Sequence, residues 1–232
     1  MILNAYQVYY SEATKKNCNL GFKLYDNTNK LTYFFENSII ADLLEQQEHK
    51  KAMFFGVFSH DVVLSDAFSK KSLQGHRFSF EGLSQYLKLN DGYDVISFWR
   101  SGFVGMRNFV LRSEEWHRGF VKCFQLILNK VGFNANIKKD TRFLIMQNHF
   151  VAKSVVWDDY YNNLLKPAMR VMQEDEEIKK MLFVNTGYKA HENKSHLKRQ
   201  IGLDYYPMHP FICERFISTF LNERLNYKCK HW

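Results

Sequence analysis

Glycine and proline are scarce in this chain, with 11 and 3 among its 232 residues. A β-sandwich needs many tight turns, which these two residues supply, so their scarcity argues against that class. The sequence contains four cysteines, Cys18, Cys123, Cys213 and Cys229, which show no Cys-x-x-Cys spacing and form no His/Cys cluster of the zinc-binding kind. Scattered single cysteines are typical of a reducing cytosol.

Several segments that would assign a location or an activity are missing. No apolar run reaches the ~20 residues that a membrane span needs. Residues 1–6 lack the basic region and the long apolar region of a signal peptide. Glycine-rich phosphate loops and the HExxH and GxSxG motifs are absent, which disfavours P-loop NTPases, dinucleotide dehydrogenases, zincins and α/β-hydrolases. We therefore expect a cytoplasmic protein, or one peripheral on the inner face of the membrane.

The composition that remains is apolar, aromatic and basic. Hydrophobic residues make up 46% and aromatic residues 16%, which allows a large core. The net charge of +8 attracts anions such as nucleic acid, phosphorylated small molecules or an anionic membrane. The basic residues are spread over small clusters instead of one stripe, so no specific nucleic acid partner is expected. We find no internal repeat or linker and expect a single domain over residues 1–232, with a C-terminal helix and tail from about residue 211.

The order of apolar runs and helical patterns predicts an α/β fold. Short apolar runs predict buried strands, and residues that recur on one face predict helices. Alternation of the two predicts a mostly parallel, Rossmann-like sheet flanked by helices. A kink is expected at Pro167, which lacks an N–H, and residues 185–200 are expected to form a mobile loop. The expected strands are residues 2–10, 53–58, 93–99 and 142–146, and the expected helices are 33–49, 79–89, 113–132, one starting at 154, and 211–225.

Polar residues stand at several predicted strand ends. Ligands of open α/β sheets bind beyond the carboxyl ends of the strands, so these residues are candidates for one site. Asn148 and Lys153 lie in a stretch that we interpret as the seam between a buried strand and the next helix. The candidates are Tyr6 and Gln7; Ser59, His60 and Asp61; Asn148, His149 and Lys153; and His209, Glu214 and Arg215.

Each candidate has a chemistry that suits it to a phosphorylated ligand. Asp61 could bind Mg²⁺ or Mn²⁺ or act as a base, and His60 could donate a hydrogen bond to a phosphate or a sugar hydroxyl. Lys153 and Arg215 could neutralise a diphosphate, and Glu214 could serve as a general base. Structural roles are equally open at this point: Arg215 could hold the last helix against the sheet, and Glu214 could simply pair with it.

Three parts of the chain resemble a known family. The family comprises small glycosyltransferases of bacterial capsule and exopolysaccharide clusters, placed with the GT-A nucleotide-diphospho-sugar transferases. Asp61, Val62 and Val63 stand where the family has Tyr-Arg-Arg, and the glycine that precedes the family's Glu-Arg is absent. The likeness lies in Phe-Gly-Val-Phe-Ser-His at residues 55–60, in Tyr-Asp-Val-Ile at 93–96, and in the pair formed by 148–153, followed by Trp-Asp-Asp-Tyr at 157–160, with 210–216.

The resemblance implies transfer of a sugar from a nucleotide-diphosphate donor to a glycan or lipid-linked acceptor, in synthesis of capsule, exopolysaccharide or lipopolysaccharide. It also implies a divalent cation, Mn²⁺ or Mg²⁺, between the donor diphosphate and an acidic residue, for which Asp61 is the best candidate by position. Asp61, His60 and Glu214 are then the expected catalytic residues. Tyr6, Gln7, Asn148, Lys153 and Arg215 are the expected donor-binding residues.

Two other functions are left open by the residues. A non-enzymatic basic module could bind nucleic acid or acidic glycan through the net charge of +8. A phosphate-transfer enzyme is less favoured, because the sequence has no cluster of closely spaced carboxylates that could hold two metals. The C-terminal residues 220–232 mix aromatic and basic side chains and could rest on an anionic membrane, or pack on the domain as a tail.

Overall fold

The computed structural model describes residues 1–18, 20–60, 62, 78–98 and 108–231. These residues form a mixed sheet with the strand order β2-β1-β3-β5-β4-β6. All pairings are parallel except the two that involve β5, which runs against both of its neighbours. The α/β prediction is therefore confirmed, and the sheet is mixed. Its strands are β1 (Leu3–Tyr9), β2 (Lys23–Asp26), β3 (Phe54–Ser59), β4 (Val95–Ser97), β5 (Phe150–Lys153) and β6 (Cys229–His231).

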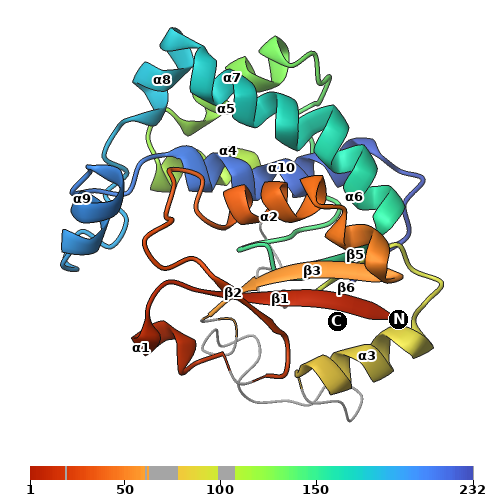
Figure 1. Cartoon of the computed structure of the whole chain (residues 1–232). Helices are drawn as coiled ribbons and strands as arrows, with labels where there is room; N and C mark the ends of the chain where they lie inside the picture. The colour runs from red at the N-terminus through yellow and green to blue at the C-terminus, as the bar shows by residue number, and fades with distance from the viewer. Residues whose placement is uncertain (19, 61, 63–77, 99–107, 232) are drawn as a thin grey trace.

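Helices cover both faces of the sheet (Figure 1). On one face, α3 (Phe80–Leu89) packs against alternate strand residues such as Phe54 and Phe58. On the other face, α2 (Glu36–Glu45), α6 (Ser154–Tyr160) and α10 (His209–Glu223) bury Phe55 and Val57. The alternation follows from the two-residue period of a strand, which turns successive side chains to opposite faces.

The predicted strand at residues 142–146 is wrong. Its backbone groups bond to side chains of α10 instead of to another strand: Arg142 N donates to Asn222 Oδ1 at 2.7 Å, and Ile145 N donates to Ser218 Oγ at 2.8 Å. The strand forms later, at β5, after a turn in which Gln147 has a φ of 53°. An apolar run predicts burial, but its hydrogen-bond partners decide whether it becomes a strand.

The predicted helix over residues 113–132 is two helices, α4 (Phe109–Trp116) and α5 (Phe120–Lys130). Ser113 is not a helix cap; it lies inside α4 and its hydroxyl donates to the Phe109 carbonyl at 2.9 Å. The carboxylate of Glu114 instead accepts from two backbone N–H groups around the start of α5, at 2.6 and 2.8 Å. This capping contact stabilises the break between the helices.

At Pro167, where a kink or restart is predicted, the helix widens into a π turn and then restarts. After α6 the chain makes one π-helical segment, η3 (Tyr161–Leu165), and then continues as α7 (Lys166–Glu174) with Pro167 in its first turn. Proline has no N–H and its ring collides with a preceding carbonyl, and the π turn accommodates both effects. Ser154, predicted to cap α6, instead donates its hydroxyl to the His49 carbonyl at 2.7 Å.

The remaining helices are all short. They are α1 (Glu12–Lys15), the 3-10 turn η1 (Glu48–Lys51), α8 (Glu176–Leu182) and α9 (Ser195–Ile201). The expected loop at residues 185–200 thus contains the start of a helix, which packs through a small separate core of Leu31, Leu197 and Ile201. The C-terminal tail adds β6 to the sheet, parallel to β4. No helix in the described part of the chain is long and apolar enough to cross a membrane.

Candidate functional site

A cavity of about 470 Å³ lies at the carboxyl ends of β1 and β3. At this point the chain connections lead to opposite sides of β1. From β1 the chain passes to β2 on one side, and later returns to β3 on the other side of β1. In an open α/β sheet this divergence leaves a crevice at the carboxyl ends of the two strands, where ligands bind. Tyr10 lines the cavity after β1, and Ser59 and His60 line it at the end of β3. The volume is within the range of small-molecule sites.

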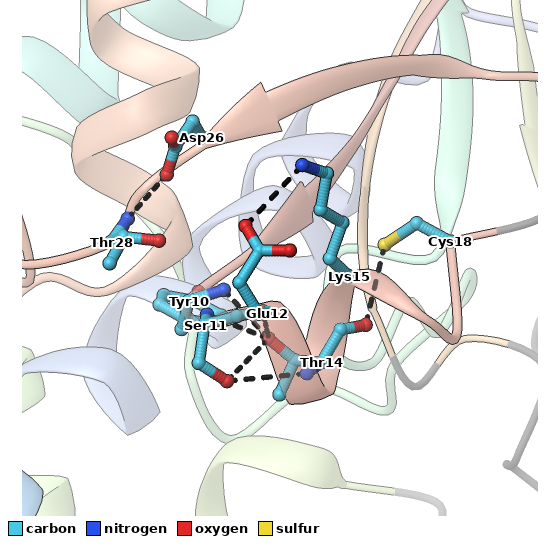
Figure 2. A network of polar contacts seen from close by, with 8 residues as sticks. All are labelled: Tyr10, Ser11, Glu12, Thr14, Lys15, Cys18, Asp26 and Thr28. Carbon is cyan, nitrogen blue, oxygen red and sulfur yellow. Dashed lines mark hydrogen bonds and ion pairs between the residues drawn. The ribbon is translucent and has the colours of Figure 1, made fainter.

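A hydrogen-bonded turn fixes the residues that follow β1 (Figure 2). The backbone N–H groups of Tyr10 and Ser11 both donate to Thr14 Oγ1 at 2.9 Å, and Thr14 N donates back to Ser11 Oγ at 3.2 Å. The hydroxyl of Tyr10 then donates to Glu36 Oε1 at 2.5 Å. The carboxylate of Glu36, in the first turn of α2, is thereby held at the cavity wall.

Asn148 reaches the cavity because β5 is antiparallel. The beginning of β5 lies at the same edge of the sheet as the carboxyl ends of β1 and β3. Asn148 is only 7% exposed and lines the cavity, and its side-chain amide makes no hydrogen bond to any other residue in the described ranges. A buried amide without a protein partner is a group that a ligand can satisfy.

Backbone strain is concentrated at this cavity. Within the described ranges, six residues other than glycine have a positive φ, and four of them line the cavity. Phe35 is the most strained, with φ 51° and ψ −128°, a region that a bulky side chain rarely adopts. Such conformations persist only where the surroundings impose them, and they cluster at ligand sites. The four are Phe35, Gln147, Asn148 and Lys189.

Glu214 is the ionisable group on the α10 side of the cavity. Burial raises the pKa of its carboxyl, the adjacent Arg215 opposes this rise, and Glu36 adds to it. The side chain is still 22% exposed toward the cavity. Because a carboxylate with a raised pKa accepts protons more readily, Glu214 suits general acid–base chemistry.

Arg215, expected to bind the donor diphosphate, does not line this cavity. Arg215 is 2% exposed and lies behind Glu214, with its guanidinium 4.2 Å from the ring centre of Phe109. Its Nη1 donates to Glu214 Oε2 at 2.6 Å and its Nε donates to Ser113 Oγ at 3.0 Å. Arg215 therefore contacts the carboxylate of Glu214 and not the cavity.

Residues 184–206, which we name the cover segment, line the cavity on its outer side. Its stem is closed by Thr186, whose N and Oγ1 both donate to the Tyr206 carbonyl, at 3.3 and 2.8 Å. Lys189 pairs with Glu192 at 3.3 Å, whereas Arg199 has no ion pair with any residue that the structure describes. We missed these residues in the sequence; the mixture of aromatic and basic side chains in a polar stretch was the available signal.

Tyr6, Gln7 and Lys153 do not reach the cavity. The hydroxyl of Tyr6 donates to Glu48 at 2.7 Å, and Gln7 is fully buried, with Nε2 donating to the Ser59 carbonyl at 3.4 Å. Lys153 pairs with Asp94 at 3.1 Å. It lies at the far end of β5, and therefore at the opposite edge of the sheet from Asn148.

The remaining candidates are buried or lie outside the described residues. His209 packs among Tyr33, Phe34 and Phe183, and burial lowers its pKa to about 4. His149 is 1% exposed. Asp61, the expected metal ligand, is outside the described ranges.

The described residues do not provide an obvious cation site. Within the ranges that the structure describes, no group of three or more His, Cys, Asp or Glu side chains could hold a metal ion. The carboxylates of Glu36, Glu192 and Glu214 already bond to Tyr10, Lys189 and Arg215. A divalent cation therefore stays a prediction that depends on Asp61.

Comparisons of the chain with protein-family models, with curated proteins and with solved structures found no match. The cavity combines a place at the carboxyl ends of β1 and β3, strained backbone, the Asn148 amide, which has no hydrogen-bond partner among the described residues, and a carboxyl with a raised pKa. These features together are typical of a small-molecule site with acid–base chemistry.

Proposed function

We propose that the protein is a glycosyltransferase that binds a nucleotide-diphosphate sugar in this cavity. It transfers the sugar to a hydroxyl group of a glycan or lipid-linked acceptor. The observation that carries the proposal is the strained, polar cavity at the carboxyl ends of β1 and β3. In doubly wound folds this is the place where nucleotides bind. We accordingly assign the sheet to the GT-A type.

Two cations of the cover segment suit the donor diphosphate. Lys189 and Arg199 line the cavity, and Arg199 has no ion-pair partner among the described side chains. A guanidinium binds phosphate oxygens through its planar pair of N–H groups. Tyr206 and Phe211 supply aromatic surface at the same cavity, on which a base or a sugar ring can pack.

Glu214 is the proposed base of the transfer. Its carboxylate takes the proton from the acceptor hydroxyl as the oxygen attacks the anomeric carbon of the donor. The new C–O bond forms while the bond from that carbon to the diphosphate oxygen breaks, and the nucleoside diphosphate leaves with the electron pair. The raised pKa of Glu214 brings the carboxylate closer to the range in which a base works well near neutral pH.

The likeness of residues 55–60 and 210–216 to capsule glycosyltransferases supports a role in surface polysaccharide synthesis. That role would act in the cytoplasm or at the inner face of the membrane, where lipid-linked acceptors are available. His60, Asn148 and Glu214 belong to the segments of this likeness and line the cavity, as do Ser59, Pro210 and Phe211. His60, Asn148 and Glu214 are the residues that we assign to donor and acceptor contacts.

Thermal unfolding in the presence of UDP-, GDP- and CMP-sugars, with and without Mn²⁺, tests the proposal. A bound donor raises the melting temperature by mass action, so at least one donor class should give a shift. Glu214→Gln should keep this shift and lose about 100-fold or more in transfer rate. Glu115→Gln, on the exposed side of α4, is the control and should keep both.

A different outcome would contradict the glycosyltransferase proposal. If no nucleotide sugar changes the melting temperature, and DNA or RNA binds with strong salt dependence, the chain is a basic binding module. In that case Glu214→Gln would have no effect on nucleic acid binding, because the carboxylate is largely buried and faces the cavity.

A further inference from the structure

Arg215 is held more firmly than an ordinary ion-pair partner. Its guanidinium lies over the ring of Phe109, at 4.2 Å from the centroid, and close to that of Phe120, at 5.8 Å. Its Nε donates to Ser113 Oγ at 3.0 Å. The hydroxyl of Ser113 is in turn bonded to the Phe109 carbonyl inside α4. α4 therefore fixes both the plane and the rotation of the guanidinium.

This arrangement leaves one oxygen of Glu214 available. Arg215 Nη1 bonds to Oε2 at 2.6 Å, and Oε1 has no hydrogen-bond partner within the described part of the chain. Glu214 lines the cavity while Arg215 lies behind it. A carboxylate held by one oxygen and open at the other can act on a ligand in a single orientation.

The pair is costly for stability alone. A buried ion pair seldom stabilises a fold more than apolar residues of the same size, because both charges lose their hydration. Here the guanidinium is almost completely buried and only the carboxylate reaches the cavity. The cost is understandable if the purpose of Arg215 is to orient Glu214.

We propose that Arg215, anchored by Ser113 and Phe109, is a positioning residue that holds the Glu214 carboxylate toward the cavity. The catalytic consequence rests on the proposed glycosyltransferase function, whereas the effect on the Glu214 carboxyl does not. Arg215 makes no contact with the ligand in this scheme.

The charges around Glu214 set the direction of the expected pH effect. Arg215 lowers the pKa of Glu214 and Glu36 raises it, so a weaker contact with Arg215 should raise that pKa further. His117, next to Arg215, has its pKa lowered to about 4 by burial and by the Arg215 charge, and is neutral near pH 7. The other charged or titratable groups that line the cavity are Tyr10, His60, Tyr188, Lys189, Glu192, His196, Arg199 and Tyr206, and Cys213 adjoins Glu214 on α10.

Two substitutions test the proposal, and the second disturbs the contact between Arg215 and Glu214 more than the first. Ser113→Ala removes the anchor and leaves Arg215 and the cavity residues in place. Arg215→Lys keeps the positive charge and loses both the Nε donor and the planar stacking. Arg112→Lys is the matched control, because Arg112 is exposed on α4 beside Ser113 and, among the residues that the structure describes, its guanidinium pairs with Glu115 alone.

The first readout needs no substrate. The Glu214 carboxyl is followed by ¹³C NMR in protein labelled at glutamate Cδ, with Glu214→Gln identifying its signal. Its titration midpoint should move to higher pH in Ser113→Ala, and further in Arg215→Lys. Arg112→Lys should leave it unchanged. The same midpoints in all variants would overturn the proposal.

The second readout is the pH profile of transfer. The acid limb of kcat/KM should move to higher pH in the same order, with kcat lowered about threefold in Ser113→Ala and about tenfold or more in Arg215→Lys. The KM for the donor should stay within about twofold of the wild-type value, because Arg215 does not contact the bound donor. A raised donor KM with an unmoved acid limb would make Arg215 a donor contact and refute the positioning role. A shifted carboxyl titration in a protein without any transferase activity would support positioning and refute the proposed function.

Discussion

At the residue scale, the main feature is backbone conformation at the cavity. Gln147 and Asn148 are consecutive residues in the left-handed region, with φ of 53° and 55°. The side chain of Gln147 is exposed, whereas that of Asn148 is only 7% exposed. Substitutions at the two positions therefore distinguish the contribution of the backbone conformation from that of the buried amide. Glycine adopts this conformation without the steric cost of a Cβ atom.

We expect Asn148→Gly to retain stability and lose ligand affinity. Relief of strain offsets the greater chain entropy of glycine, so the free energy of unfolding should stay within about 0.5 kcal/mol of the wild type. Affinity for the donor sugar should fall about five- to tenfold because an amide hydrogen bond is lost. Urea unfolding and calorimetric titration measure the two quantities.

Gln147→Gly is the control for this substitution. It changes the same turn without removing a buried amide, so it should be as stable as the wild type or more stable, with affinity within about twofold. Equal affinity in Asn148→Gly and the wild type would show that the Asn148 amide does not bind the ligand.

Gly56 is required by the close approach of β5 to β3. A Cβ added at this position would lie 2.7 Å from Val151 Cγ1 and 3.0 Å from the Phe150 carbonyl oxygen. Gly56→Ala should therefore lower the free energy of unfolding by about 1–3 kcal/mol, as overpacked cores do. Gly92→Ala, where a Cβ would meet no atom within 4 Å, is the control and should be nearly neutral. A neutral Gly56→Ala would mean that β5 can move away from β3 at little cost.

At the element scale, the cover segment is attached more weakly than the rest of the chain. Its buried apolar residues, Leu197 and Ile201, pack with Leu31 in a cluster separate from the two large cores, and its contacts with the larger core come from the half-buried Tyr206 and the exposed Tyr188. A segment with few buried contacts opens at a lower free energy than the global unfolding. Since Lys189 and Arg199 are carried by this segment, its opening must weaken their contacts with a ligand.

Leu197→Ala should loosen the cover segment alone. Leu197 is fully buried in the small cluster, so its truncation removes much of what holds α9 down. We expect faster amide hydrogen exchange in residues 184–206 and weaker donor binding, while global stability falls by less than about 1 kcal/mol. Leu128→Ala in the large core should instead lower global stability by about 2–5 kcal/mol. A similar global loss in both variants would show that the cover segment unfolds together with the core.

The sequence predicted α3 and α10 to within two residues at each end; the apolar residues of α3 recur on one face and Ser79 caps it, whereas α10 is buried on nearly all sides. Helical periodicity could not find the break between α4 and α5, since the apolar pattern continues across it. The break depends on Glu114, whose carboxylate caps α5 from the preceding helix. It could not exclude a strand at residues 142–146 either, because the partners of that backbone lie on α10.

At the scale of the whole molecule, the direction of β5 decides which predicted site residues meet. The sequence indicated polar groups at strand ends, and His60, Asn148 and Glu214 do line one cavity. Asn148 and Lys153 were expected together, yet β5 separates them and its antiparallel direction puts Lys153 at the other edge. Strand direction follows from long-range pairing, which the local pattern of a single sequence does not contain.

Acid should destabilise the molecule in two steps. Burial lowers the pKa of His117 and of His209 to about 4, below the 6.5 of an ordinary histidine. The unfolded chain therefore takes up these protons first, and stability falls as the pH drops from 6.5 to about 4. Burial opposes ionisation of Glu48, but hydrogen bonds from Lys51, Tyr6 and Asn4 lower its pKa from 4.5 to about 2. Stability from Glu48 is thus present above 4.5 and is lost as the pH falls toward 2.

The urea midpoint measured against pH checks this expectation. His209→Phe keeps an aromatic ring among Tyr33, Phe34 and Phe183 and removes the titrating group, so the decline between pH 6.5 and 4 should become shallower. His191→Gln, at an exposed position, should leave the decline as it is. An unaltered slope in His209→Phe would rule out the buried imidazole as its source.

The reversed strand also has a consequence for how the chain reaches its folded state. β1, β2 and β3 come from the first part of the sequence and can pair with one another early. The other edge of β3 stays unpaired until β5 docks, and β5 is formed by residues far along the chain. Closing that long loop costs entropy before any contact rewards it, so docking of β5 should be a late and slow step of folding. Until then the apolar edge of β3 is open to pairing with another molecule. Refolding yield should therefore decline as protein concentration rises, even where the finished fold is stable.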